Sequence, residues 1–155
     1  MFKIGIIGRG FVGSAVAQGF SQAVGYNAEI RIFDKDPLKK IDSLEDVVKH
    51  SEFVFISVPT PSNQDGSINL DILEACLEEI DQTANKLNAY EAIYLIRSTV
   101  VPGTTRKFQA KFKNLKFVFN PEFLTERSAN FDFISQTRFV LGGEKNNVSK
   151  VRDLY

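Results

Sequence analysis

The fold is decided by residues 2–13, which read Phe2-Lys3-Ile4-Gly5-Ile6-Ile7-Gly8-Arg9-Gly10-Phe11-Val12-Gly13. The first half is a short apolar run, typical of a buried strand, and the second half has the glycine spacing G-x-G-x-x-G. Small and apolar residues then recur at helical spacing from residue 11 to residue 24, which predicts an amphipathic helix. A glycine turn between a strand and a helix is the context expected of a dinucleotide-binding fingerprint.

Each glycine of this turn has a physical role. Gly8 permits the tight bend, Gly10 lets a pyrophosphate approach the backbone, and Gly13 lets the helix pack closely on the strand. The helix N-terminus, which carries a partial positive charge, then faces the phosphates. Phe11 and Val12 lie between the glycines, and we expect both to contact the cofactor. The alternative is a glycine-rich turn that holds no ligand.

The choice of cofactor depends on Asp34, which stands at the end of the second predicted strand, 21 residues after Gly13. A carboxylate at this position accepts hydrogen bonds from both ribose hydroxyls and repels the 2′-phosphate of NADP. The sequence therefore favours NAD. Lys35 follows directly, and its positive charge softens that repulsion.

Short apolar runs and helical patterns alternate along the rest of the chain, which is typical of an α/β protein with a parallel sheet. We expect one Rossmann domain over residues 1–155, with a doubly wound sheet of six parallel strands in the order 3-2-1-4-5-6. Ser43 is expected to cap a short helix, and Pro102 to stand in the first turn of another. The expected strands are 2–7, 29–33, 53–58, 92–96, 115–119 and 138–141, and two further helices are expected at 70–86 and 146–155.

Composition restricts the class of protein. The 155 residues include 19 basic and 19 acidic side chains, a balance that gives no reason to expect a nucleic acid or a membrane as partner. The single cysteine, Cys76, allows no internal disulfide and fits a reducing compartment, so the cytoplasm is expected. No long apolar run predicts a transmembrane helix, and the N-terminal strand leaves no room for a signal peptide. No cluster of side chains has metal-ligand spacing.

Three further segments lie at the carboxyl ends of predicted strands, where open α/β sheets bind their ligands. They are Val58-Pro59-Thr60-Pro61, Ser98-Thr99-Val100-Val101-Pro102-Gly103-Thr104-Thr105 and Asn120-Pro121-Glu122-Phe123-Leu124-Thr125-Glu126. Together with the glycine turn, and in this order, these segments resemble the UDP-glucose/GDP-mannose dehydrogenase family. The resemblance covers essentially the whole chain and matches the N-terminal, NAD-binding half of that family.

The resemblance implies an activity. The family oxidises the C6 alcohol of a nucleotide sugar to a carboxylate with two NAD⁺ in succession, and a cysteine nucleophile holds the sugar between the two steps. It further implies that Thr99, Glu122 and Glu126 are catalytic, with Thr99 beside the reacting carbon and the glutamates orienting or deprotonating water. Phe123 and Leu124 would contact the nucleotide sugar, with UDP-glucose the expected one. Cofactor contacts are implied for Val58, Pro59, Thr60, Ser98 and Thr99.

The chain also departs from the family. The regions that carry the cysteine nucleophile and most of the sugar pocket are absent, so NAD binding without turnover is expected. Cys76 lies on a predicted helix and is expected to be a small packing residue. The segment between the second and third strands, residues 34–52, is shorter than usual. Arg127 stands where many members of the family have glycine.

Three alternatives remain open at this stage. Taken alone, Glu122 and Glu126 could be acidic residues in the first turn of a helix. The chain could be a stand-alone NAD-binding module that docks a partner through an exposed stripe on 146–155, formed by Val148, Val151, Leu154 and Tyr155. It could also be a different Rossmann dehydrogenase, such as a 3-hydroxy-acid type, although the segment 120–126 argues against this. A missing C-terminal half or a homo-oligomer would complete the protein in the favoured interpretation.

Overall fold

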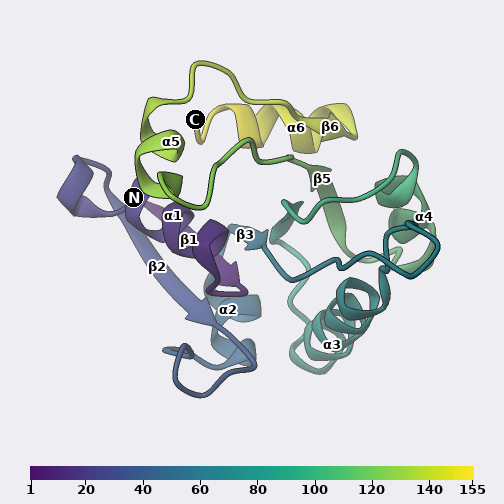
Figure 1. Ribbon diagram of the computed structural model, residues 1–155. Coiled ribbons are helices and arrows are strands. Elements are labelled where there is room, and N and C mark those ends of the chain that lie inside the picture. The colour runs from purple at the N-terminus through teal and green to yellow at the C-terminus, as the bar shows by residue number, and fades with distance from the viewer.

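The computed structural model describes all residues from 1 to 155 and contains one six-stranded sheet with helices on both faces (Figure 1). The strand order is β2-β1-β3-β4-β5-β6, and all neighbours are parallel except β5 and β6, which are antiparallel. The α/β Rossmann fold expected from the sequence is confirmed. The strands are β1 (Phe2–Ile7), β2 (Ala28–Phe33), β3 (Phe53–Ile56), β4 (Ile93–Ile96), β5 (Lys116–Phe119) and β6 (Gly142–Gly143).

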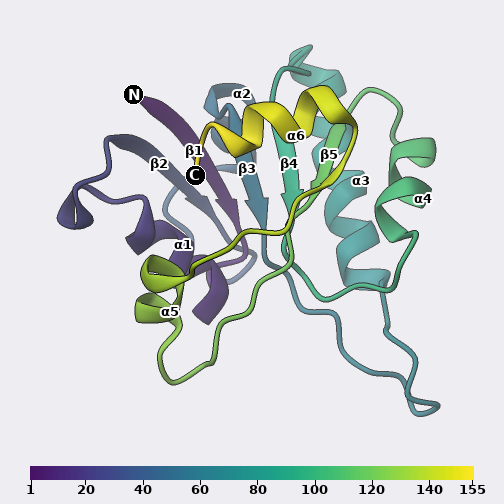
Figure 2. The ribbon, with the colours of Figure 1, turned by 90° about the horizontal axis from the view of Figure 1, so that it is seen from above.

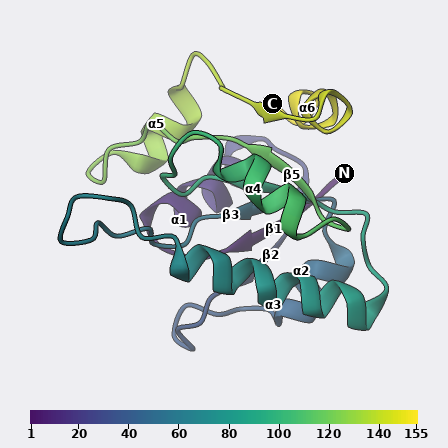
Figure 3. The same ribbon diagram turned by 90° about the vertical axis from the view of Figure 1, so that its right-hand side faces the viewer.

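Two apolar cores cover the two faces of the sheet. Alternate side chains of each strand point to opposite faces, so Phe53 and Phe55 join one core while Val54 and Ile56 join the other. One face carries α2 (Leu44–His50), α3 (Asp71–Leu87) and α4 (Thr104–Lys111). The other carries α1 (Phe11–Gly19), α5 (Ala129–Ser135) and α6 (Lys145–Arg152), and a single-turn helix, η1 (Gln22–Val24), follows α1. Figure 2 shows α6 lying across the strands, and Figure 3 shows the long helix α3 below the sheet.

The observed strand order corrects the predicted order 3-2-1-4-5-6. The strand over Phe53–Ile56 does not lie outside β2 but pairs with β1 and β4, between them. The physical reason is the short segment 34–52, which holds only α2 and no strand, so that β2 is the edge of the sheet. The residue types of the two strands also indicate which one is central and which one lies at the edge. Every residue of β3 is apolar and buried, as a central strand requires, whereas β2 includes Glu29 and Arg31.

The last strand was also predicted wrongly. The segment 138–141 is irregular, and β6 is a two-residue strand at Gly142–Gly143 that runs antiparallel to β5. Phe139 and Val140 are exposed, so this apolar run is not a core strand. Pro102 also lies outside the helix in which it was predicted, because α4 begins two residues later at Thr104. Ser43 does cap α2 as expected, since its Oγ accepts a hydrogen bond from the Asp46 amide at 3.0 Å.

The C-terminal helix is part of the core and not a docking surface. Val151 and Leu154 are completely buried, and Val148 and Tyr155 pack against the same apolar cluster. The hydroxyl of Tyr26 donates a hydrogen bond to the Leu154 carbonyl, which ties the end of the chain to the start of β2. The exposed stripe expected of a stand-alone docking module is therefore contradicted.

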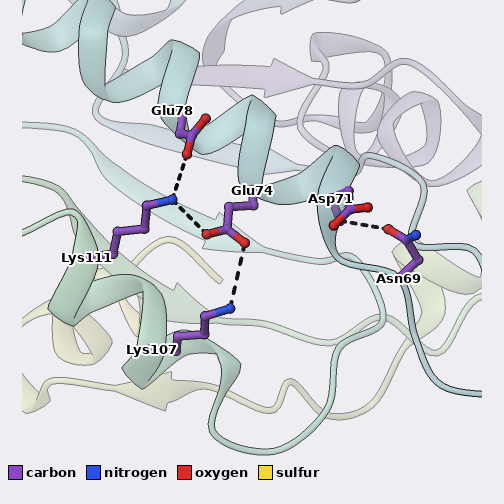
Figure 4. Close-up of polar contacts among 6 residues, drawn as sticks. All are labelled: Asn69, Asp71, Glu74, Glu78, Lys107 and Lys111. Carbon is purple, nitrogen blue, oxygen red and sulfur yellow. Dashed lines mark hydrogen bonds and ion pairs between the residues drawn. The ribbon is translucent and has the colours of Figure 1, made fainter.

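Helices α3 and α4 are joined by a cluster of charged side chains (Figure 4). The Lys111 ammonium lies 2.7 Å from Glu74 and 2.6 Å from Glu78, and Lys107 lies 3.7 Å from Glu74. The hydrogen bond from Lys111 holds the pKa of Glu74 below its ordinary value, against the opposing effect of burial. On the opposite face α5 packs closely on α1, because a Cβ at Gly19 would overlap the ring of Phe133.

No helix of the structure combines the length and the apolar character that crossing a membrane requires.

Candidate cofactor and catalytic site

The glycine turn has the geometry that its sequence predicts. Gly8 has a φ of +93°, and a Cβ there would lie 2.5 Å from the Ser57 carbonyl oxygen, so only glycine fits. A Cβ at Gly13 would overlap the carbonyl oxygen of Gly8. Because glycine has no Cβ, α1 can start directly against β1. Gly10 is different, since no atom lies within 4 Å of a Cβ at that position.

The space at Gly10 is open to a ligand. Gly10 is the N-cap residue of α1, and no side chain bonds to the amides of the first turn. Those amides and the partial positive charge of the helix end are a ready site for a phosphate. Phe11 is exposed and Val12 is half-buried beside this space. The turn therefore offers a cradle that any side chain at Gly10 would fill.

Asp34 is fixed by backbone amides at the end of β2. Its Oδ2 accepts a hydrogen bond from the Arg9 amide at 2.6 Å, and its Oδ1 accepts one from the Asp36 amide at 2.8 Å. An ionised carboxylate has about four lone-pair positions, so two bonds leave capacity for the two hydroxyls of a ribose. The two amides thus hold the carboxylate in place beside the glycine turn.

A pocket of about 110 Å³ opens next to Asp34, between the ends of β1, β2 and β3 and the start of α3. Among its lining residues are five of the predicted cofactor residues, namely Gly8, Asp34, Lys35, Val58 and Pro59. Reasoning from the sequence missed the other side of this pocket, which includes Leu44, Ile72, Cys76 and Glu79. The spacing of Ile72, Cys76 and Glu79 places them on one helical face, and this signal was available in the sequence. Of the three, the sequence interpretation considered only Cys76, as a packing residue.

A larger pocket lies elsewhere. It has a volume of about 620 Å³ and lies between the start of α4 and the edge of the sheet formed by β5 and β6. None of the predicted cofactor or catalytic residues lines it, so its size does not make it the cofactor site.

Cys76 is a packing residue, as expected. Its side chain is only 6% exposed, and burial raises the pKa of the thiol to about 12. Because the thiolate is the nucleophilic form of cysteine, this thiol is inert at neutral pH.

The loops after β3 and β4 are bonded to each other. The Ser98 hydroxyl donates to the Val58 carbonyl at 2.7 Å, and the Thr60 hydroxyl donates to the Thr99 carbonyl, also at 2.7 Å. Ser98 is buried, whereas Thr99 and Pro59 are exposed. The two predicted segments therefore form one surface at the carboxyl edge of the sheet.

The segment 120–126 leaves β5 as an irregular loop, and α5 begins only at Ala129. Glu122 and Glu126 are therefore not residues of a first helical turn, which removes that alternative. The Glu122 carboxylate accepts a hydrogen bond from the Leu124 amide at 2.6 Å, while Glu126 is exposed. Leu124 packs on the core, and Phe123 is 62% exposed.

A buried polar cluster that the sequence interpretation missed supports the start of this loop. Arg97 is 2% exposed and donates to the Asn120 side-chain oxygen at 2.7 Å, which also accepts from the Tyr155 hydroxyl at 2.7 Å. The Arg97 Nε and Nη2 have no partner, and burial lowers the pKa of the guanidinium. An arginine directly after the apolar strand Ile93–Ile96 was the available signal. Through Asn120, the cluster joins the loop after β4 to the loop after β5.

Comparison with known proteins agrees with this geometry. The model of the UDP-glucose/GDP-mannose dehydrogenase family, NAD binding domain, matches residues 36–155. A UDP-glucose 6-dehydrogenase of Rickettsia conorii is 31% identical over 79% of this chain and 28% of its own length. UDP-glucose 6-dehydrogenase AglM of Haloferax volcanii is 27% identical over 92% of this chain and 41% of its own length.

Among solved structures, a UDP-glucose dehydrogenase from the archaeon Pyrobaculum islandicum superposes with a TM-score of 0.83 at 26% identity, covering 100% of this chain and 44% of that one. The chain thus spans less than half the length of each of these relatives. The family match begins after the glycine turn and Asp34, so the turn geometry is an independent indication of the same cofactor. The chain belongs to the UDP-glucose/GDP-mannose dehydrogenase family and has the fold of its NAD-binding domain.

Proposed function

We propose that residues 1–155 form one domain that binds NAD and supplies the cofactor half of a nucleotide-sugar 6-dehydrogenase. The observation that carries this proposal is the cradle at Gly10 beside the fixed carboxylate of Asp34. NAD⁺ bound there would supply a hydride acceptor at the carboxyl edge of the sheet. The residues of this chain orient it, with the α1 N-terminus holding the pyrophosphate and Asp34 holding the adenosine ribose.

The catalytic residues of the proposal are Thr99, Glu122 and Glu126. All three follow strands that end at the same edge, and the Thr60–Thr99 and Leu124–Glu122 hydrogen bonds hold two of their loops. In this function Thr99 lies beside the reacting carbon, and the two carboxylates orient and deprotonate the water that releases the product. Phe123, largely exposed, and Leu124 offer apolar and backbone contacts to the sugar nucleotide.

The proposed substrate is a UDP-sugar, with UDP-glucose favoured because the named relatives are UDP-glucose 6-dehydrogenases. The overall oxidation of the alcohol to the carboxylate consumes two NAD⁺. The chain alone is expected to bind NAD⁺ without turnover, because its one thiol is buried and protonated. A second polypeptide segment has to provide the nucleophile and the rest of the sugar pocket.

Two measurements test this function. Calorimetric titration should give saturable NAD⁺ binding that weakens at least about tenfold in Asp34→Ala, a loss of about 1.4 kcal/mol. Asp36→Ala is the matched control, since it removes a neighbouring carboxylate outside the pocket lining. No NAD⁺ binding by the wild-type chain would contradict the proposal.

The catalytic assignment is tested in a chimera in which residues 1–155 replace the corresponding part of the Pyrobaculum islandicum enzyme. NADH formation from UDP-glucose should fall at least about a hundredfold in Glu126→Gln, as expected for loss of a general base. Arg127→Gln is the control for the neighbouring exposed position. Equal rates for Glu126→Gln and the unmodified chimera would refute the role of this carboxylate.

A further inference from the structure

Glu79 is a residue of α3 that lines the 110 Å³ pocket beside Asp34. Glu79 and Lys35 both line this pocket, and their side chains are bonded, with the Lys35 ammonium 2.8 Å from the Glu79 carboxylate. This hydrogen bond is the main reason that the pKa of Lys35 is raised. The contact joins two elements 44 residues apart in sequence, so it reflects the tertiary arrangement.

Lys35 is the basic residue that a 2′-phosphate would need. Rossmann proteins that accept NADP place a cation near the end of β2, where it can pair with the phosphate of the adenosine ribose. Lys35 directly follows Asp34 and lines the pocket, so it occupies this place. If Asp34 were the only acidic residue of the pocket, the Lys35 ammonium would be free to offset the repulsion between the Asp34 carboxylate and a 2′-phosphate.

Two other cations of this region, Arg9 and Lys40, have contacts of their own. The Arg9 guanidinium donates to the carbonyl of Lys39 at 3.3 Å. The Lys40 ammonium lies 5.6 Å from the centre of the Phe33 ring. Neither residue lines the pocket, so among its walls the charged side chains are Asp34, Lys35 and Glu79.

We propose that Glu79 is a specificity-determining residue, which excludes NADP by holding the Lys35 ammonium away from a 2′-phosphate and by adding a second negative charge to the pocket. With Lys35 paired, a phosphate that enters meets two carboxylates and no unpaired cation among the residues that line the pocket. The pair does not affect NAD in the same way, because its 2′-hydroxyl is neutral. The inference rests on the proposed NAD binding and adds a residue of α3 to the selection that Asp34 begins.

The test is a double-mutant cycle read as the ratio of the dissociation constants for NADP⁺ and NAD⁺, measured by calorimetry on the full chain. Glu79→Gln should lower this ratio by about fivefold or more, because one charge is removed and one cation is freed within reach of a doubly charged phosphate. Glu78→Gln is the matched control, since it removes the same charge from the preceding position of α3. The Glu78 carboxylate pairs with Lys111 and does not line the pocket. The control should leave the ratio unchanged.

The second arm of the cycle uses Lys35→Ala. If Glu79 acts through Lys35, Glu79→Gln should lower the ratio less in the Lys35→Ala background than in the wild type, and the two substitutions should be coupled. An unchanged ratio in Glu79→Gln, or an equal effect in both backgrounds, would overturn the proposed mechanism. Failure of the wild-type chain to bind either nucleotide would overturn the NAD-binding function itself, and this outcome is distinguished by the wild-type titration alone.

Discussion

Gly10 and Gly13 of the cofactor turn should respond in different ways to the same substitution, Gly10 with a loss of NAD⁺ affinity and Gly13 with a loss of stability. Gly10 has φ −79° and ψ −163°, a conformation open to any residue, and a Cβ there meets nothing within 4 Å. Gly10→Ala should therefore change the free energy of unfolding by less than about 1 kcal/mol, because the restriction that alanine places on the unfolded chain offsets its poorer fit as an N-cap residue. The new methyl group would occupy the space needed by the pyrophosphate, so NAD⁺ binding should weaken at least about tenfold.

Gly13→Ala is the structural counterpart. Its Cβ would overlap a backbone oxygen, which cannot move aside as a flexible side chain does. The expected cost is about 1–3 kcal/mol, as for other overpacked sites. For a chain of this length that lowers the midpoint of thermal unfolding by about 3 °C per kcal/mol.

The assay combines urea unfolding, which gives stability, with calorimetric titration of NAD⁺, which gives affinity. The result that would refute the reasoning is an NAD⁺ affinity in Gly10→Ala equal to that of the wild type. The pyrophosphate would then not lie against Gly10. A Gly10→Ala protein that is strongly destabilised would instead contradict the open space seen in the structure.

Three further predictions concern stability and reactivity. Lowering the pH from 6 to 3 should destabilise the wild type more than Glu74→Gln in thermal unfolding. The pKa of Glu74 is lower in the folded than in the unfolded protein, so the carboxylate stabilises the fold above its unfolded-state pKa, and this stability is lost as the pH falls through its folded-state pKa. Parallel pH profiles would show that the Glu74–Lys111 contact contributes nothing. The Cys76 thiol should not react with Ellman's reagent at pH 8 until the protein is unfolded, because burial raises its pKa to about 12; rapid reaction of the folded protein would place the thiol at the surface. Leu154→Ala should lower the free energy of unfolding by about 2–5 kcal/mol because the side chain is completely buried, whereas a loss below about 0.5 kcal/mol by urea titration would indicate a surface position.

Local features of the fold were predictable because a few adjacent residues determine them. The turn at Gly8, the cap at Ser43 and the buried thiol of Cys76 each follow from local steric or burial requirements. The apolar runs also identified five of the strands, with small differences at their ends. The position of the carboxyl ends at one edge then follows from parallel pairing, so Asp34 and the loop segments were correctly placed at that edge.

Features that depend on distant segments were not predictable in the same way. The order of strands depends on which strands pair with β1 in the folded chain, and the one local indication of it, the polar residues Glu29 and Arg31 in β2, was not used. The burial of Val151 and Leu154 depends on where α6 crosses the sheet, because an amphipathic helix looks the same whether its partner is its own core or another protein. The roles of Glu79 and Arg97 depend on contacts with Lys35 and Asn120, which only the folded chain brings together.

The close packing of α5 on α1 has a consequence for how the site is aligned. Helix α1 begins at the cofactor turn, and α5 follows the loop that carries the two glutamates. Because the Phe133 ring occupies the space that a Cβ at residue 19 would need, the close spacing of these helices requires glycine at that position. A side chain at residue 19 would push α5 outward and shift the loop that carries Glu122 and Glu126 relative to the cofactor turn. In the proposed function, the distance between the cofactor and the two glutamates therefore depends on a helix contact at Gly19 that lies outside the predicted site.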